Sequence, residues 1–141
     1  KKKYKLVSYE NILDNKQHLA IVNGDLKKNL IPKVRVLSSN SLDIFTSKNI
    51  SNEIKNSIKL LSNYKPSVII IIKESDFSDL PKIINYNKNE IYKNSKLRDY
   101  GVGAQILNKL KIKTMILVTK SKKTVIGLEG FGIKIKKQEI I

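Results

Sequence analysis

The sequence predicts an α/β domain: a mixed sheet flanked by helices, with an antiparallel N-terminal part. Short apolar or alternating runs with turn signals between them come first, before any helical pattern appears. Further along, apolar residues recur at helical spacing between continuous apolar runs such as 68–72 and 114–119, which are typical of buried strands. Strands followed by alternating strands and helices favour an antiparallel start to a mixed sheet.

Length and composition indicate a single globular domain covering residues 1–141. The chain has 141 residues, of which 40% are hydrophobic, enough for one core but short for two. Its longest unbroken apolar run, 68–72, is far too short to cross a bilayer, so no membrane partner is expected. The N-terminal lysines are followed by no apolar region, which argues against a signal peptide and for a cytoplasmic protein.

The formal net charge of +16 raises the question of a nucleic-acid partner. Lysine supplies nearly all of this charge, whereas arginine, the residue that best matches phosphates and base edges, occurs only at Arg35 and Arg98. The lysines are spread along a chain that is also rich in Asn and Ile, a composition that an AT-rich genome produces without any partner. We therefore expect no specific nucleic-acid site, and a basic nucleic-acid-binding module remains the weaker alternative.

The N-terminal part contains three expected strands. Residues 4–9 alternate like an edge strand, and Asp14-Asn15 marks a turn. Residues 18–23 form the next strand, which ends at Gly24-Asp25, and 32–38 form the third. His18 is the only histidine; beside an apolar strand, a lone histidine is more often structural than catalytic.

The remainder alternates between helices and strands. Apolar residues at helical spacing predict an amphipathic helix over 50–62, capped near Asn49 or Ser51, and a buried strand follows at 67–72. Further helices are expected at 79–92 and 97–110, and a short one near 122–129. The strand 114–119 and a last short strand at 133–135 complete the sheet.

Two motifs near the end carry a family resemblance. The stretch Leu-Arg-Asp-Tyr-Gly-Val-Gly-Ala-Gln-Ile-Leu at 97–107 precedes an apolar strand ending in Thr119, and Gly-Leu-Glu-Gly-Phe-Gly follows at 127–132. In this order and at this separation they resemble the C-terminal signature of GTP cyclohydrolase II, and the resemblance extends to 18–36. It implies a zinc enzyme that hydrolyses GTP to open riboflavin synthesis. In many members a 3,4-dihydroxy-2-butanone 4-phosphate synthase precedes this domain.

The resemblance also implies a zinc site for which this chain lacks the ligands. Family members hold Zn²⁺ with three cysteines, and this chain contains none. Asn40 stands where the first ligand is expected, and the other two fall among Lys48 to Ser51. Neutral oxygen ligands bind zinc poorly and a lysine repels it, so no metal and no other cofactor are expected. The family's aspartate proton acceptor is replaced by Lys96, which cannot accept a proton at neutral pH.

Four positions still match residues that contact the nucleotide or take part in catalysis in the family: Arg35, Ser38, Arg98 and Thr119. A structural role outweighs a functional one for the set, because fold outlasts function in such domains. Where a ligand site persists, the resemblance implies a weak phosphate or guanine-nucleotide pocket around Arg98, bordered by lysines 120, 122 and 123. Strand ends and helix N-termini form such crevices in open α/β sheets.

The sequence therefore predicts a catalytically degenerate GTP cyclohydrolase II-like domain of a riboflavin-biosynthesis protein. Its expected role is a non-catalytic interaction or stabilising module for an attached synthase domain, with no intact catalytic residue. An active cyclohydrolase with a rebuilt site is the alternative within the same class. A homodimer is left open.

Overall fold

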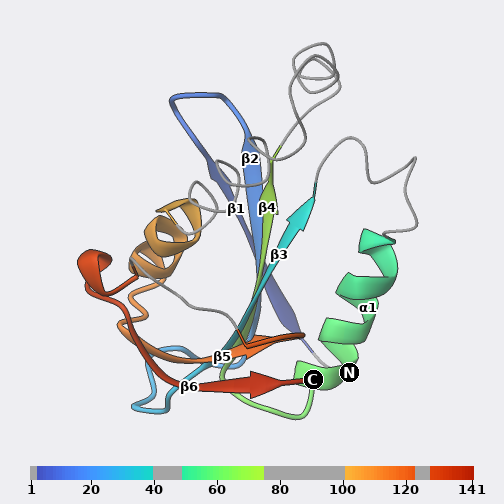
Figure 1. Ribbon diagram of the computed structural model, residues 1–141. Helices are drawn as coiled ribbons and strands as arrows, with labels where there is room; N and C mark the ends of the chain where they lie inside the picture. Colours follow the sequence, from blue (N-terminus) through green and yellow to red (C-terminus); the bar gives the residue numbers. More distant parts are fainter. Residues whose placement is uncertain (1–2, 40–48, 75–100, 123–127) are drawn as a thin grey trace.

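The structure, a computed structural model, describes residues 3–39, 49–74, 101–122 and 128–141. Its described strands form one six-stranded sheet in the order β1-β2-β4-β3-β5-β6 (Figure 1). The strands are β1 (Tyr4–Glu10), β2 (Gln17–Asn23), β3 (Lys33–Ser39), β4 (Ser67–Lys73), β5 (Thr114–Thr119) and β6 (Lys134–Ile140). These bounds confirm the predicted strands, except that the last one is longer than expected.

Pairing in the sheet changes from antiparallel to parallel along its width. β2 pairs with both β1 and β4 in the antiparallel sense, whereas β3 runs parallel to β4 and to β5, and β5 runs parallel to β6. The mixed sheet with an antiparallel N-terminal part is thus confirmed. The sheet twists strongly, so that β5 and β6 cross the view in a different direction from β1, β2 and β4 in Figure 1.

The helix α1 (Ile50–Leu61) begins and ends close to the predicted positions. Asn49 is its N-cap, and the Asn49 side-chain oxygen accepts a hydrogen bond from the backbone N–H of Asn52 at 3.0 Å. Ile54, Ile58 and Leu61 lie on one face of the helix and pack on the sheet. The apolar spacing that predicted the helix is therefore also the spacing that attaches it to the core.

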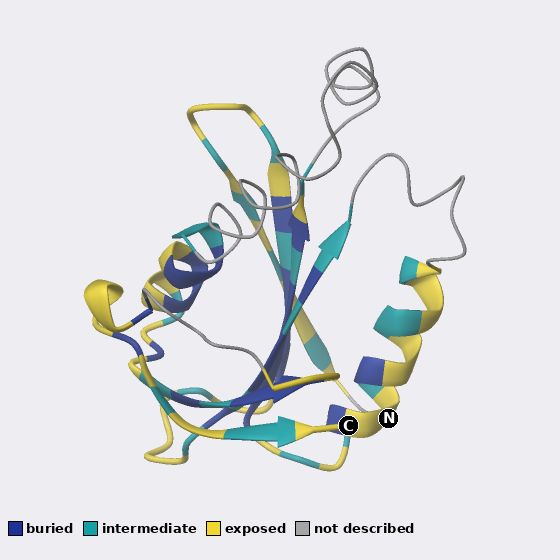
Figure 2. Ribbon diagram, in the orientation of Figure 1, coloured by how far each residue is buried: buried dark blue, intermediate teal, exposed yellow. Residues whose placement is uncertain are grey.

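Helices cover both faces of the sheet, so the core has two layers (Figure 2). β4 serves both, because successive side chains point to opposite faces: Val68, Ile70 and Ile72 face one side, and Ile69 and Ile71 face the other. We call the side of Ile69 the α1 face. The opposite face is covered by a helix described at residues 101–109, which contributes Ala104, Ile106 and Leu107 to the core.

The C-terminal strand differs from its prediction. It runs over Lys134–Ile140 and pairs with β5 along its whole length, with a register shift at Met115/Ile116 that places Lys136 in a bulge. Its lysines are exposed at the edge of the sheet. They interrupt the apolar pattern in the sequence, so the strand was predicted too short. A 3₁₀ turn, η3 (Glu129–Phe131), precedes it.

Some predicted elements fall outside the described residues. The helix expected at 79–92 lies wholly outside the described residues. Of the short helix expected near 122–129, residues 123–127 also lie outside them. The helix expected at 97–110 is confirmed over 101–109. Among the described helices, none has the length and apolar character needed to span a membrane.

Candidate functional site

Two of the predicted site residues lie on the face covered by the helix at 101–109. Thr119 is the last residue of β5 and is buried, and its hydroxyl donates a hydrogen bond to the backbone oxygen of Ser121 at 2.8 Å. Ser38 pairs in register with Ile72, so its side chain points to the same face near the end of β3. The described pairing of β3 with β5 stops at Val34 and Leu117, and the two strands diverge beyond that point (Figure 1).

Arg35 lies on the opposite, α1 face. It pairs in register with Ile69, and only 4% of its surface is exposed. Among the described groups, the Arg35 Nε and Nη1 atoms have no hydrogen-bond partner. Burial lowers the pKa of Arg35, because a desolvated guanidinium is less stable, and the carboxylate of Glu53 partly opposes this effect. A buried cation of this kind needs a compensating anion.

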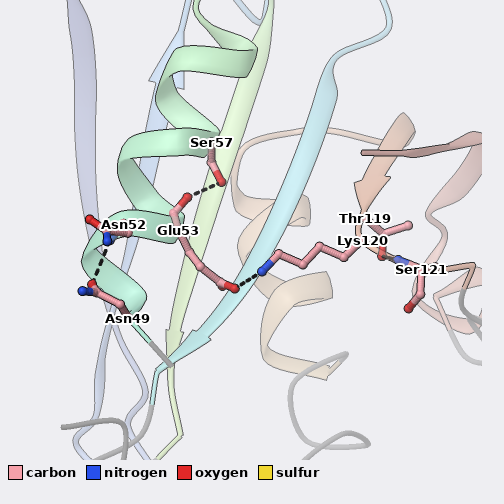
Figure 3. Close-up of polar contacts among 7 residues, drawn as sticks. All are labelled: Asn49, Asn52, Glu53, Ser57, Thr119, Lys120 and Ser121. Atoms are coloured by element: carbon pink, nitrogen blue, oxygen red, sulfur yellow. Dashed lines mark hydrogen bonds and ion pairs between the residues drawn. The ribbon is translucent and has the colours of Figure 1, made fainter. Parts of the chain in front are cut away.

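That anion comes from the first turn of α1. The Glu53 carboxylate accepts a charge-assisted hydrogen bond from Lys120 Nζ, and Figure 3 shows the lysine reaching toward α1 from the end of β5. The Glu53 side chain is about one-fifth exposed, whereas that of Lys120 is mostly exposed. Arg35, Glu53 and Lys120 therefore form a charged cluster, which we call the α1 cluster, built from three separate elements.

The structure thus divides the predicted site between two faces. Ser38 and Thr119 lie on one side of the sheet, and Arg35 lies on the other. Arg98 and Lys123 lie outside the described residues, as do Lys96 and Thr124. The lysine at 120, expected at the Thr119 pocket, reaches instead to α1.

Sequence reasoning did not find Glu53. Its signal was modest: an acidic residue in the first turn of a helix, where it stabilises the positive end of the helix dipole. Such residues are common, and nothing in the sequence connects this one to a lysine 67 positions later. Only the tertiary fold brings the two together.

The donor groups near the expected metal site do not fit zinc. The chain has no cysteine, and the described residues contain no group of three His, Cys, Asp or Glu side chains that could hold a metal ion. Asn49 uses its side-chain oxygen to cap α1, and Ile50 and Ser51 belong to the helix itself. Asn40 and Lys48 lie outside the described residues. The chemistry of these side chains is that of a helix start, with no soft ligand.

A separate hollow of about 520 Å³ lies beside β6. Ile135, Gln138 and Ile140 from β6 form part of its lining, with Leu128 and Ile133 beside them. Lys122 also contributes to it, three residues after Thr119. Neither Arg35 nor Ser38 is among its described lining residues, so the hollow and the α1 cluster are different places on the molecule.

Comparison with known proteins agrees with the motifs and the fold. The sequence model of the family described as GTP cyclohydrolase II matches residues 1–139, nearly the whole chain. The chain belongs to the GTP cyclohydrolase II family. The sequence prediction of that family is therefore confirmed.

Similar curated proteins are longer than this chain. Riboflavin biosynthesis protein RibBA from Chlorobium phaeovibrioides is 30% identical over 94% of the chain, and RibBA from Endomicrobium trichonymphae is 30% identical over 96%. A 3,4-dihydroxy-2-butanone 4-phosphate synthase from Photobacterium phosphoreum is 26% identical over 94%. The chain covers only 36%, 38% and 38% of these relatives. It therefore corresponds to one part of them.

A solved structure supports the fold. RibBX from A. baumannii, described as a two-domain 3,4-dihydroxy-2-butanone 4-phosphate synthase, superimposes with a TM-score of 0.56 at 22% identity. The match covers 97% of this chain and 35% of RibBX. This likeness establishes the same fold for nearly all of the chain.

Proposed function

We propose that this domain is a catalytically degenerate member of the GTP cyclohydrolase II family. The observation that carries the proposal is the absence of cysteine from a chain whose family holds its catalytic zinc with three thiolates. Lys96 in place of the family's proton acceptor supports it, since an ammonium group cannot take up a proton at neutral pH. Without those thiolates, the chain lacks the family's means of holding a zinc-activated water for attack on GTP.

The proposal is tested by two measurements on the same preparation. Elemental analysis of protein purified without chelators is expected to find no stoichiometric zinc. Incubation with GTP is expected to release no formate above a blank without protein. A stoichiometric metal together with formate release would instead establish the alternative, an active cyclohydrolase with a rebuilt site.

The proposed present role is an interaction or stabilising module for an adjoining 3,4-dihydroxy-2-butanone 4-phosphate synthase domain. The chain corresponds to little more than a third of these two RibBA relatives, and a part of RibBX, described as a two-domain 3,4-dihydroxy-2-butanone 4-phosphate synthase, shares its fold. The formal net charge of this domain, +16, gives it long-range attraction to an acidic partner surface.

The proposed stabilising role is tested by producing this domain together with a 3,4-dihydroxy-2-butanone 4-phosphate synthase domain, either fused to it or as a separate chain. Synthase activity and its thermal midpoint are measured with and without this domain. We expect the domain to raise the midpoint of the synthase, because a partner that binds only the folded state stabilises it. An unchanged midpoint together with no co-elution on size exclusion would refute this role.

We also propose a residual phosphate pocket around Arg98, with Ser38 and Thr119, which share a face of the sheet, as its other family positions; Arg35 lies on the opposite face. Thr119 at the carboxyl end of β5 supports it, since ligands bind at such strand ends in open α/β sheets. Calorimetric titration with GTP, GDP and pyrophosphate is expected to show weak binding that Arg98→Ala reduces. If Arg98→Ala leaves the titration unchanged, these positions only maintain the fold.

A further inference from the structure

The α1 cluster brings two cations to one carboxylate. Arg35 approaches from β3 beneath the helix, and Lys120 approaches from the end of β5. Glu53 forms the ion pair with Lys120, and its charge acts at longer range on Arg35, which lies on the same face of the sheet as α1. The cluster is therefore positive by one charge even when Glu53 is ionised.

The guanidinium of Arg35 is incompletely satisfied. Its Nε and Nη1 atoms are buried and, within the part of the chain that the structure describes, have no hydrogen-bond partner. Buried N–H donors are normally paired, and charged ones more strictly so, because leaving them unpaired costs the full desolvation of the group. Two donor atoms of a buried cation thus lack an acceptor among the described residues.

The N-terminus of α1 adds to the same preference for an anion. The helix has 12 residues, and Glu53 lies in its first turn, beside the N-cap Asn49. The positive end of the helix dipole and the two cations all favour negative charge at this place. The Glu53 carboxylate is held at the place where a small anion would be most stable.

From this arrangement we propose that Glu53 is a built-in competitor for a small oxyanion of the phosphate class at Arg35 and Lys120. Its tethered carboxylate pairs with Lys120 and lies where its charge also acts on Arg35, so a free oxyanion must displace it to bind. Removing the negative charge of Glu53 then exposes an oxyanion site between α1, β3 and the end of β5. The site lies on the opposite face of the sheet from Ser38 and Thr119, so the inference does not rest on the pocket proposed around Arg98.

The contact also fixes a loop. Lys120 lies between Thr119 and Ser121. The Thr119 hydroxyl donates a hydrogen bond to the backbone oxygen of Ser121. The ion pair with Glu53 therefore anchors the turn after β5 to the first turn of α1 (Figure 3). An oxyanion that displaces Glu53 from Lys120 loosens this anchor, so binding and the position of the turn are linked.

The decisive variant is Glu53→Gln, with Glu10→Gln as its matched control. Glu10 is exposed at the end of β1, and both substitutions raise the net charge equally. Both variants are titrated calorimetrically with pyrophosphate and with inorganic phosphate. We expect Glu53→Gln to bind these anions at least about threefold more tightly than Glu10→Gln does. This change in affinity is the one expected when a partly exposed ion pair no longer competes with the anion. Equal affinities would overturn the proposal.

Two further comparisons of variants can also contradict the proposal. The double variant Glu53→Gln/Arg35→Met is expected to return to the affinity of Glu10→Gln, which separates a site at Arg35 from general charge. If Glu53→Gln does not fold by circular dichroism, Lys120→Gln is compared with Lys5→Gln, an equal loss of charge at an exposed position of β1. Weaker pyrophosphate binding by Lys120→Gln supports the site, and equal binding excludes it.

A nucleotide arm identifies the source of the phosphate group. GMP binding to Glu53→Gln at the affinity of inorganic phosphate indicates a site for the phosphate group alone, and tighter binding of GMP indicates that the nucleoside also contributes. Arg98→Ala is titrated in parallel. Failure of Arg98→Ala to change binding removes the pocket around Arg98 without affecting the comparison of Glu53→Gln with Glu10→Gln.

Discussion

The side-chain amide of Asn23 donates a hydrogen bond to the backbone oxygen of Leu61 at 3.2 Å, joining the end of β2 to the end of α1. The same nitrogen also lies within hydrogen-bond distance of the backbone oxygens of Ser62 and Tyr64 and of the hydroxyl of Ser67. Asn23 is almost completely buried. One amide thereby joins the backbone groups at the end of the helix, where carbonyls lack intrahelical partners, and it shares the Leu61 oxygen with the Tyr64 N–H and the Ser67 hydroxyl.

This contact predicts a large stability effect. We expect Asn23→Ala to lower the free energy of unfolding by about 2 kcal/mol, since it removes a buried donor shared by the backbone oxygens of Ser62 and Tyr64. The backbone oxygen of Leu61 keeps its hydrogen bonds from the Tyr64 N–H and the Ser67 hydroxyl. Asn23→Asp should lower it further, because a carboxylate would face those carbonyl oxygens. Asn108→Ala is the control: it removes one exposed hydrogen bond, to the backbone oxygen of Phe131, and should cost less than about 1 kcal/mol. Urea unfolding curves that show equal losses for both alanine variants would contradict this prediction.

The turn after β2 gives a second prediction about stability. Gly24 has φ of +89°, and a Cβ added there would lie 3.1 Å from Cβ of Lys65. Gly24→Ala should therefore destabilise the domain by about 1–2 kcal/mol through backbone strain and crowding. Gly130→Ala is the matched control, since Gly130 has no positive φ and no described atom within 4 Å of the added Cβ. Thermal midpoints that fall equally in both variants would show that crowding at Gly24 is not the cause.

Local patterns in the sequence were enough to predict most of the fold. The isoleucines of α1 recur at helical spacing, and Asn49 is a residue type that favours N-caps, so the helix and its start could be predicted. The buried strand at β4 is a continuous apolar run for the same local reason. β6 was predicted too short because its exposed edge positions carry lysines, which interrupt the apolar pattern without interrupting the pairing with β5.

The site was harder to predict because it depends on contacts between distant segments. Alternation along β3 shows that Arg35 points away from Val34, but only the packing of α1 shows which element covers that side. The Lys120–Glu53 pair joins residues 67 positions apart and follows from the sheet order, which places β5 next to β3. Family motifs could name Arg35 and Thr119, but they could not assign them to opposite faces.

The basic charge predicts a particular kind of DNA binding. Because the chain carries +16 with only two arginines, we expect weak attraction to phosphates and no sequence preference. Fluorescence anisotropy with duplex and single-stranded DNA should show binding at about 50 mM salt that is largely lost by about 200 mM. Tight binding that persists at the higher salt and discriminates between sequences would establish the nucleic-acid-binding alternative.

His18 predicts how stability changes with pH. The backbone N–H of Lys73 donates to His18 Nδ1 at 3.1 Å, so Nδ1 must be unprotonated, and Nε2 is buried without a described partner. Desolvation lowers the pKa of His18; Asp14 opposes this and Lys16 adds to it. The neutral ring is therefore the form that fits the folded domain.

The direction of the pH effect follows from this. In the unfolded chain His18 takes up a proton near its ordinary pKa of about 6.5, whereas the folded domain resists protonation until lower pH. Below about pH 6.5 the unfolded state thus binds more protons, and the free energy of unfolding should fall as the pH falls, with the full stability present above that pH. Because His18 is the only histidine, His18→Gln removes this titration while keeping a side-chain oxygen that can accept from Lys73. Urea unfolding at about pH 7.5 and about pH 5.5 should show a larger loss for the wild type than for His18→Gln, and equal losses would show that His18 does not titrate on unfolding.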